Sequence, residues 1–138
     1  MGDDSVRQRN RETLDRIREL LRTGDWQGLS ACWADDGVME LPYALPGTPA
    51  RTVGREAISA NAAGSLALFS SFQTPEFTIF PTVDPDVFFA EYRSEAVIRP
   101  TGRTYNNLYV GYFRFRDGAL VHWKEYFNPS VIREAFRP

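Results

Sequence analysis

The residues best suited to acid–base chemistry lie near the end of the chain, in the stretch 121–128 (VHWKEYFN). Strand periodicity places Val121, Trp123, Glu125 and Phe127 on one face. Glu125 is therefore a carboxyl group on an otherwise apolar face, where an ionised carboxylate is costly unless it is paired or takes up a proton. Groups that accept this cost are often catalytic acids or bases. We interpret Glu125 as the leading catalytic residue; the alternative is a buried structural acid bonded to a tyrosine or a backbone amide.

Hydroxyl and amide side chains on other expected inward faces could complete such a site. A buried phenol can donate to a developing oxyanion or activate an epoxide oxygen, and an asparagine can orient substrate or water. Each also has a structural alternative, because tyrosines more often pack in the core and asparagines often tie strand and helix ends together. The predicted catalytic residues are Glu125, Tyr92 and Tyr43. The predicted substrate-binding residues are Tyr109, Asn107, Trp123, Asn61, Met39, Leu41, Tyr105 and Phe127.

Other chemistries are disfavoured by what the chain contains. The single histidine, His122, shares a strand face with Lys124 and is expected at the surface or in a dimer interface. That position argues against a Ser-His-Asp triad and a histidine-based metal site. Cys32 is the only cysteine, which excludes an internal disulfide and a cysteine-cluster metal site. We therefore expect no metal and no cofactor.

Size and composition predict one domain, residues 1–138, that can line a cavity with rings: 43% of the residues are hydrophobic and 14% aromatic. The formal net charge is −2, and the basic stretch between residues 7 and 22 also carries acids, which argues against nucleic acid as a partner. No apolar run approaches the length of a membrane span and no signal peptide opens the chain. We expect a cytoplasmic protein without a membrane partner.

Hydrophobic periodicity predicts helices in the first half of the chain and strands in the second. Leu14, Ile17 and Leu21 recur at helical spacing, and the period changes to two after Ser71. The predicted helices cover 5–22, 26–33 and 54–69, with a short one from Pro129; Asp36-Gly37 is predicted as a turn, and the proline-rich stretch up to Pro49 as a loop. The predicted strands cover 38–43, 77–82, 87–98, 105–116 and 119–128.

This order predicts an α+β fold, in which three helices pack against one curved, mostly antiparallel sheet. A strongly curved sheet closed on one side by helices forms a cone with an apolar interior, which is a natural pocket for a small molecule.

Three local motifs are typical of one branch of a known superfamily. They are residues 23–26 (TGDW), 34–37 (ADDG) and 54–58 (GREAI). With the order of elements, they make the chain resemble the SnoaL-like and ketosteroid-isomerase-like branch of the nuclear transport factor 2-like superfamily, whose fold is the conical α+β barrel described above. The resemblance covers nearly the whole chain, but these motifs are signatures of structure more than of function.

The C-terminal half resembles two subfamilies more closely. Residues 100–106 (PTGRTYN) and 123–128 (WKEYFN) are similar to limonene-type epoxide hydrolases. Residues 84–86 (DPD), 105–107 (YNN) and 124–128 (KEYFN) are similar to the phenazine biosynthesis A/B proteins. In both subfamilies a catalytic acid stands at the position of Glu125, which the resemblance thus implies to be catalytic.

Departures from these families limit what can be transferred. Ketosteroid isomerases carry their base at the position of Leu41 and a tyrosine at the position of Ile17, so their chemistry is not expected here. The histidine of the phenazine proteins falls on Asn61. The strand-1 tyrosine and asparagine of the epoxide hydrolases fall on Met39 and Leu41.

The Arg-x-Asp motif of the epoxide hydrolases leaves two alignments open. Without a gap it falls on Tyr92 and Ser94, and with one deletion it falls on Arg93 and Glu95. The strand pattern turns Tyr92 inward, which favours the ungapped alignment. Arg93 and Glu95 are then expected in an exposed or interfacial charge ladder.

The resemblance implies a cofactor-independent enzyme of natural-product biosynthesis that acts on an apolar, oxygenated small molecule. We expect acid–base cyclisation, by epoxide opening through an internal hydroxyl or by an aldol-type step, or isomerisation. The alternatives are an epoxide hydrolase and a non-catalytic small-molecule-binding module. By analogy with relatives, the protein is expected to be a homodimer.

Overall fold

The first helix, α1 (Asp3–Thr23), matches the predicted helix to within two residues in this computed structural model, which describes residues 2–138. Its apolar stripe of Leu14, Ile17 and Leu21 is fully buried against the sheet. The helix ends at Gly24, whose φ of 75° is left-handed and favours glycine there.

The next segment differs from the prediction. Residues 26–33 contain only a short 3₁₀ helix, η1 (Gly28–Cys32), because Trp33 already belongs to the strand β1 (Trp33–Glu40). The predicted turn at Asp36-Gly37 is wrong as well, since β1 runs through it. A Cβ on Gly37 would lie 2.4 Å from the ring of Trp33, so this glycine makes room for a buried indole.

The middle of the chain combines an edge strand with the second α-helix. The strand β2 (Arg51–Val53) pairs with β1, although the sequence pattern predicted no strand there. The helix α2 (Arg55–Leu66) ends three residues before the predicted 69, because Phe69 is buried as the first residue of β3 (Phe69–Pro81). Irregular pairing between Gln73 and Glu76 breaks the period of β3, which explains why only its second half was predicted.

The strands at 87–98 and 119–127 agree with prediction, whereas the single strand predicted for 105–116 is divided at residues 106–107 into two strands. These strands are β4 (Val87–Ile98), β5 (Thr104–Tyr105), β6 (Leu108–Arg116) and β7 (Ala119–Phe127), followed by α3 (Pro129–Ala135). In the sheet the order is β2-β1-β7-β6-β4-β3, with β5 paired to β4. Within residues 2–138, β1 and β7 pair in parallel and every other pair of strands is antiparallel.

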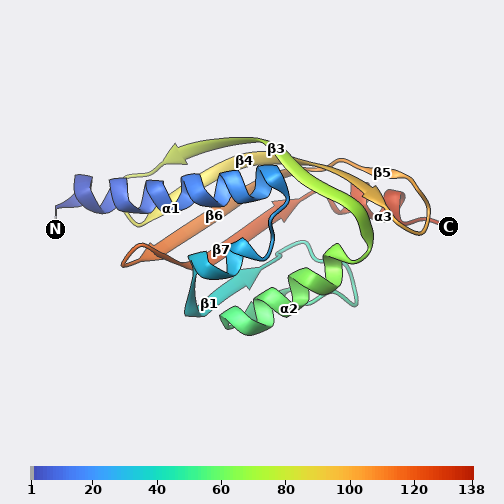
Figure 1. The fold of residues 1–138 in the computed structure, drawn as a ribbon, viewed down its shortest axis with the longest axis horizontal. Helices are drawn as coiled ribbons and strands as arrows, with labels where there is room; N and C mark the ends of the chain where they lie inside the picture. Colours follow the sequence, from blue (N-terminus) through green and yellow to red (C-terminus); the bar gives the residue numbers. More distant parts are fainter. Residues whose placement is uncertain (1) are drawn as a thin grey trace.

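The fold is the predicted α+β class, with a curved, mostly antiparallel sheet and three α-helices. Figure 1 shows α1 lying across one face of the sheet, with α2 beside β1 and α3 at the opposite end from the N-terminus. Between residues 2 and 138 no helix is both long and apolar enough to cross a membrane. The space left between the sheet and the helices is the cavity described next.

Candidate active site

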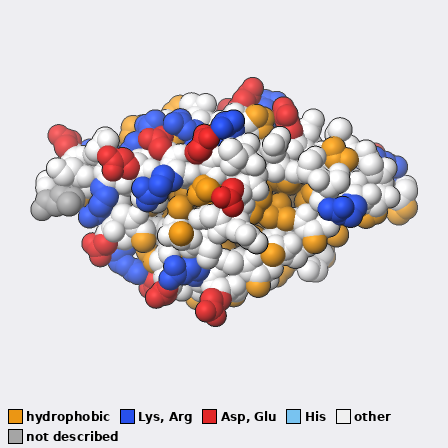
Figure 2. All heavy atoms as spheres, viewed as in Figure 1, with side chains coloured by type: hydrophobic (Ala, Val, Ile, Leu, Met, Phe, Trp, Pro, Cys, Tyr) orange, Lys and Arg blue, Asp and Glu red, His pale blue; other side chains and the backbone are white. Residues whose placement is uncertain are grey.

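A cavity of about 560 Å³ lies between the inner face of the sheet and the helix α2. It is closed further by η1, by the loop between β1 and β2 and by α3. Figure 2 shows apolar side chains gathered in a depression near the middle of this face of the molecule. The rings that line the cavity belong to Trp26, Trp33, Phe69, Phe72, Tyr105, Tyr109, Trp123, Phe127 and Phe136.

Glu125 lies on the wall of this cavity, in the strand β7. Its neighbour in β6 is Gly111, and the next residue across, in β4, is Ala90. A Cβ on Gly111 would lie 2.6 Å from the ring of Phe113 and 3.1 Å from that of Tyr92. This glycine therefore leaves the space through which Tyr92, two residues along β4 from Ala90 and on the same face, reaches Glu125.

Tyr92 binds the carboxyl group of Glu125 from the side away from the cavity. Its hydroxyl donates to Oε2 of Glu125 at 2.5 Å and accepts a hydrogen bond from Nε1 of Trp123 at 3.1 Å. The Tyr92 ring is stacked between Phe77, at a centroid distance of 4.9 Å, and Tyr109, at 5.2 Å. We call Tyr92, Trp123 and Glu125 the acid cluster. Tyr92 itself is 3% exposed and lies behind the cavity wall, so it contacts Glu125 and not the cavity space.

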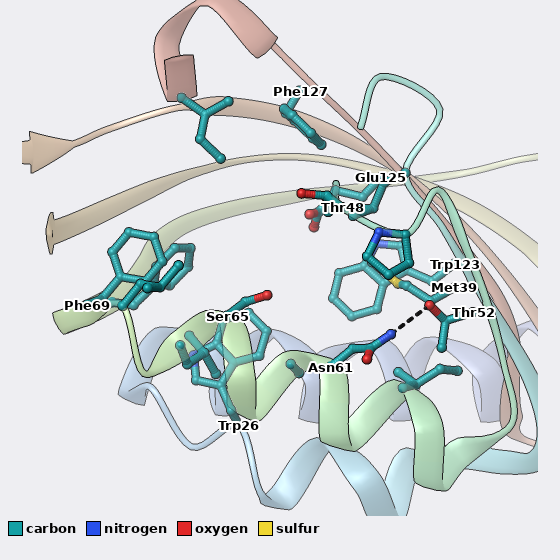
Figure 3. A pocket seen from close by; sticks show the side chains of 18 of the residues that line it. Trp26, Met39, Thr48, Thr52, Asn61, Ser65, Phe69, Trp123, Glu125 and Phe127 are labelled. Carbon is teal, nitrogen blue, oxygen red and sulfur yellow. Dashed lines mark hydrogen bonds between the residues drawn. The ribbon is translucent and has the colours of Figure 1, made fainter. Parts of the chain in front are cut away.

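The acid cluster has the electrostatics of a proton-transfer site. Burial raises the pKa of Glu125 to about 7, against the smaller lowering effect of the hydrogen bond from Tyr92. Burial and the nearby carboxyl also raise the pKa of Tyr92 well above its ordinary value, so the phenol stays protonated. Figure 3 shows Glu125 reaching into the cavity. Among residues 2–138 its Oε1 has no hydrogen-bond partner, and it is the oxygen free to meet a ligand.

A second buried polar group, the amide cluster, consists of Ser94, Tyr105, Asn107 and Tyr109. Nδ2 of Asn107 donates to the Tyr105 hydroxyl at 2.9 Å, and the hydroxyl oxygens of Tyr105 and Tyr109 lie 3.1 Å apart. The Tyr109 hydroxyl is also bonded to Ser94. Burial raises the pKa of both tyrosines, so both remain neutral.

Asn107 does not lie where a ligand in the cavity would meet it, although the sequence predicted it to bind substrate. Its side chain is absent from the cavity wall, and its polar atoms are used within the protein. Besides Tyr105, Nδ2 serves the carbonyl of Asn128, while Oδ1 accepts from the backbone N–H groups of Leu108 and Asn128. Asn107 therefore ties β6 to the end of β7, which is the structural alternative for this residue.

The predicted position of Tyr43 is also wrong. Its side chain is 55% exposed and packs against the ring of Tyr126, outside the cavity. The strand β1 ends at Glu40, and Pro42 cannot continue its hydrogen bonding. The strand alternation that turns Met39 inward therefore no longer applies to Tyr43.

The other predicted binding residues line the cavity. Figure 3 shows Met39 and Trp123 on the sheet side, and Asn61 reaching into the cavity from α2. Nδ2 of Asn61 donates to Oγ1 of Thr52 at 3.0 Å, and Asn61 is exposed rather than on the buried face expected for it. The predicted residues on the wall are Met39, Leu41, Asn61, Tyr105, Tyr109, Trp123, Glu125 and Phe127.

The charged pair Arg93 and Glu95 points away from the cavity. Both side chains are exposed, and Nε of Arg93 lies 3.4 Å from Oε2 of Glu76. By contrast, Tyr92 and Ser94 are buried. The strand β4 thus follows the ungapped alignment. His122 lies off the cavity too, where its Nε2 is 2.6 Å from Glu40.

Several wall residues were not recognised from the sequence. The proline-rich loop supplies Leu45, Pro46, Thr48 and Pro49, α3 supplies Ile132 and Arg133, and the residue after α3 supplies the ring of Phe136. The apolar residues between the prolines were the available signal for the loop, because an exposed linker has no need of them. For the C-terminal segment the signal was the pair Ile132 and Phe136, whose separation of four residues is the spacing of one helix face.

The chain belongs to the SnoaL-like domain family, within the nuclear transport factor 2-like superfamily. The family profile matches residues 14–123. Two related proteins match most of the chain. YesE of Bacillus subtilis (strain 168) is 31% identical, over 91% of this chain and 85% of the length of YesE. The PhzA/B-like protein PA3332 of Pseudomonas aeruginosa is 33% identical, over 91% of this chain and 88% of the length of PA3332. Both are named as uncharacterized proteins.

Solved structures confirm the fold. A candidate isomerase of Bacillus subtilis superposes with a TM-score of 0.82 at 28% identity, covering 99% of this chain and 96% of its own. A candidate polyketide cyclase of Xanthomonas campestris pv. campestris gives a TM-score of 0.80 at 22% identity, covering 94% and 98%. The profile match ends two residues before Glu125, so the evidence for this residue is its geometry and not the family match.

Proposed function

We propose that the protein is a cofactor-independent enzyme that uses Glu125 to move a proton during cyclisation or isomerisation of an apolar, oxygenated small molecule. One observation carries the proposal: Glu125 is the only carboxyl group among the described residues on the cavity wall, and burial brings its pKa to about 7. A carboxyl group with this pKa exchanges protons efficiently near neutral pH. The kinship with candidate cyclases and isomerases supports the same class of reaction.

The residues around Glu125 support defined roles. The ionised carboxylate would remove a proton from a substrate hydroxyl or from a carbon beside a carbonyl. The protonated acid formed in this way would then give the proton to the substrate oxygen on which negative charge develops. Tyr92 is a positioning residue, since it fixes one carboxyl oxygen and leaves the other for substrate. The rings of Trp123 and Phe127 beside Glu125 would exclude water from a bound ligand.

Simple epoxide hydrolysis is the weaker alternative. It requires a positioned water, and the side chains that replace the Arg-x-Asp pair are Tyr92 and Ser94, both committed to hydrogen bonds within the protein. An internal hydroxyl already on the substrate needs no such water, and binding in a near-attack geometry supplies much of the rate.

The test is a panel of polyketide-like 1,3-diketones and epoxy-alcohols. Incubation in D₂O would reveal proton abstraction by deuterium uptake, and ring closure by a changed chromatogram. We expect activity in the native protein, a loss of at least ~100-fold in Glu125→Gln, and no loss in the matched variant Glu95→Gln, whose carboxyl is exposed and off the cavity. Activity that survives Glu125→Gln would contradict the proposal and favour a binding module.

The expected homodimer belongs with this proposal. The outer face of the sheet exposes three large apolar side chains, Phe89 (38%), Val110 (39%) and Leu108 (47%). Exposed apolar side chains on one face suit the binding of a second copy of the chain. Light scattering should give a mass twice the 15.7 kDa of one chain. The Val110→Glu variant should give the mass of one chain. A native protein of single mass would overturn this part.

A further inference from the structure

A second charge lies on the cavity wall, at the end formed by α3. Of the described residues that line the cavity, only Glu125 and Arg133 carry charged side chains. They are eight residues apart in the sequence but lie on different elements, since the chain turns at Asn128 between β7 and α3. The wall between them consists mainly of apolar side chains, so an elongated ligand could meet one charge at each end.

The Arg133 guanidinium is not used to hold the fold together. Within residues 2–138 it makes no hydrogen bond and no ion pair. The adjacent acid, Glu134, is occupied by Arg137 at 3.2 Å. Arg133 is exposed and also lines the cavity, which places it at the rim. A guanidinium without a counter-ion in this position is available to bind an anionic group at the outer end of a ligand.

Neighbouring arginines behave differently. Arg99 donates to the backbone carbonyls of Ala67 and Phe69, at 3.3 and 2.9 Å, and Arg103 donates to the carbonyl of Arg137 at 2.6 Å. Arg99 therefore fastens the end of β4 to the start of β3, and Arg103 fastens the turn after β4 to the residues that follow α3. Neither arginine lines the cavity. On the face drawn in Figure 2, basic side chains are visible at this end of the molecule. They add a positive potential there without competing for the position of Arg133.

We infer that Arg133 binds a carboxylate group of the substrate, so that the natural ligand is an apolar ring system with an acid at the end remote from the reacting atoms. This inference rests on the proposed function for the role of Glu125. The two charges would fix one orientation: Arg133 attracts the carboxylate, and Glu125, when ionised, repels it. The reacting oxygen or carbon would then lie at Glu125.

The test compares two probes of the same shape, 2-naphthoate and 2-naphthamide. Quenching of tryptophan fluorescence would report binding, because Trp26, Trp33 and Trp123 line the cavity. At pH 6, below the pKa of Glu125 of about 7, we expect the carboxylate to bind roughly tenfold more tightly than the amide. This advantage should shrink as salt is added.

Variants separate a specific contact from general charge. Arg133→Gln should abolish the preference for 2-naphthoate over 2-naphthamide without weakening the binding of 2-naphthamide. Arg133→Lys should retain part of the preference. Arg51→Gln makes the same change in net charge at an exposed position off the cavity and should keep the full preference. Equal binding of the two probes by the native protein, or an equal loss in Arg51→Gln, would overturn the inference.

The failure of this inference can be told apart from failure of the proposed function. Glu125→Gln should abolish turnover yet keep the preference for 2-naphthoate. Turnover that depends on Glu125 without any carboxylate preference removes only the role of Arg133. A carboxylate preference that persists while Glu125→Gln has no effect on turnover removes the enzyme and leaves an acid-binding protein.

Discussion

The acid cluster and the amide cluster are neighbours, since Tyr92 and Ser94 both lie on β4 and the rings of Tyr92 and Tyr109 are stacked. Their hydrogen bonds nevertheless differ in one respect. In the amide cluster, both the N–H groups and the oxygen of the Asn107 side chain are bonded within the protein. In the acid cluster, one oxygen of Glu125 is held by Tyr92 and the other has no partner among residues 2–138. The first arrangement stabilises the fold, and the second leaves a titratable group for a ligand.

This comparison teaches that burial alone does not identify a functional polar residue. Asn107 is 3% exposed, and Tyr92 is equally buried, but neither reaches the cavity. What distinguishes Glu125 is its place on the cavity wall, with one carboxyl oxygen that has no partner within residues 2–138, combined with a raised pKa. The predictions below test the division of roles between the two clusters.

The largest effect is expected from breaking the amide cluster. Asn107→Ala removes the hydrogen bonds of the Asn107 side chain and leaves the backbone N–H groups of Leu108 and Asn128 without their acceptor. We expect unfolding to become easier by about 3 kcal/mol, measured by urea denaturation. The pKa of Glu125 should stay near 7 in the folded variant; a large fall would show that the two clusters are not separate.

The next effect concerns the pH dependence of stability. The folded-state pKa of Glu125 is raised to about 7, whereas an unfolded glutamate titrates near ~4.3. The folded form therefore loses stability as the pH rises from the unfolded value through 7. Glu125→Gln escapes this loss, so between pH 5 and pH 8 it should gain about 2 kcal/mol relative to the native protein. A constant difference across this range would contradict a buried acid.

Filling the space beside the acid cluster should disturb it directly. The added methyl group in Gly111→Ala would meet the rings of Phe113 and Tyr92. We expect a loss of about 2 kcal/mol in stability and a displaced Tyr92 hydroxyl. Near-ultraviolet circular dichroism would detect the change around Tyr92, and thermal unfolding would measure the loss of stability. An unchanged melting temperature would show that the strands accommodate the methyl group without loss of stability.

The smallest effect is expected from removing a single hydroxyl. Tyr92→Phe deletes the hydrogen bond that lowers the pKa of Glu125 and leaves Nε1 of Trp123 without its acceptor. Stability should fall by about 1 kcal/mol, and the midpoint of the pH–rate profile should move upward. The control Tyr43→Phe changes an exposed hydroxyl off the cavity and should alter neither quantity.

Much of this arrangement was visible in the sequence. Trp123, Glu125 and Phe127 alternate along β7, and the same regularity places Tyr92 on the buried face of β4. It does not show that Tyr92 lies behind the cavity wall. Prediction failed where an element ended or bent: Pro42 ends the alternation before Tyr43, and irregular pairing after Gln73 conceals the first half of β3.

Other features depend on contacts between distant segments. The amide of Asn107 has a role only because the end of β7 passes beside it. Arg133 lines the cavity only because α3 turns back toward β5 and Phe69. Local periodicity contains no information about such long-range contacts, so these residues could not be assigned without coordinates.

The most direct measurement is the titration of the Glu125 carboxyl carbon by NMR, with Glu125→Gln used to assign its signal. The account predicts a midpoint of about 7, caused by burial among aromatic rings. A midpoint near the free value of ~4.3, or below it, would show a solvated or salt-bridged carboxylate. Glu125 would then not be the proton-transfer group of the cavity.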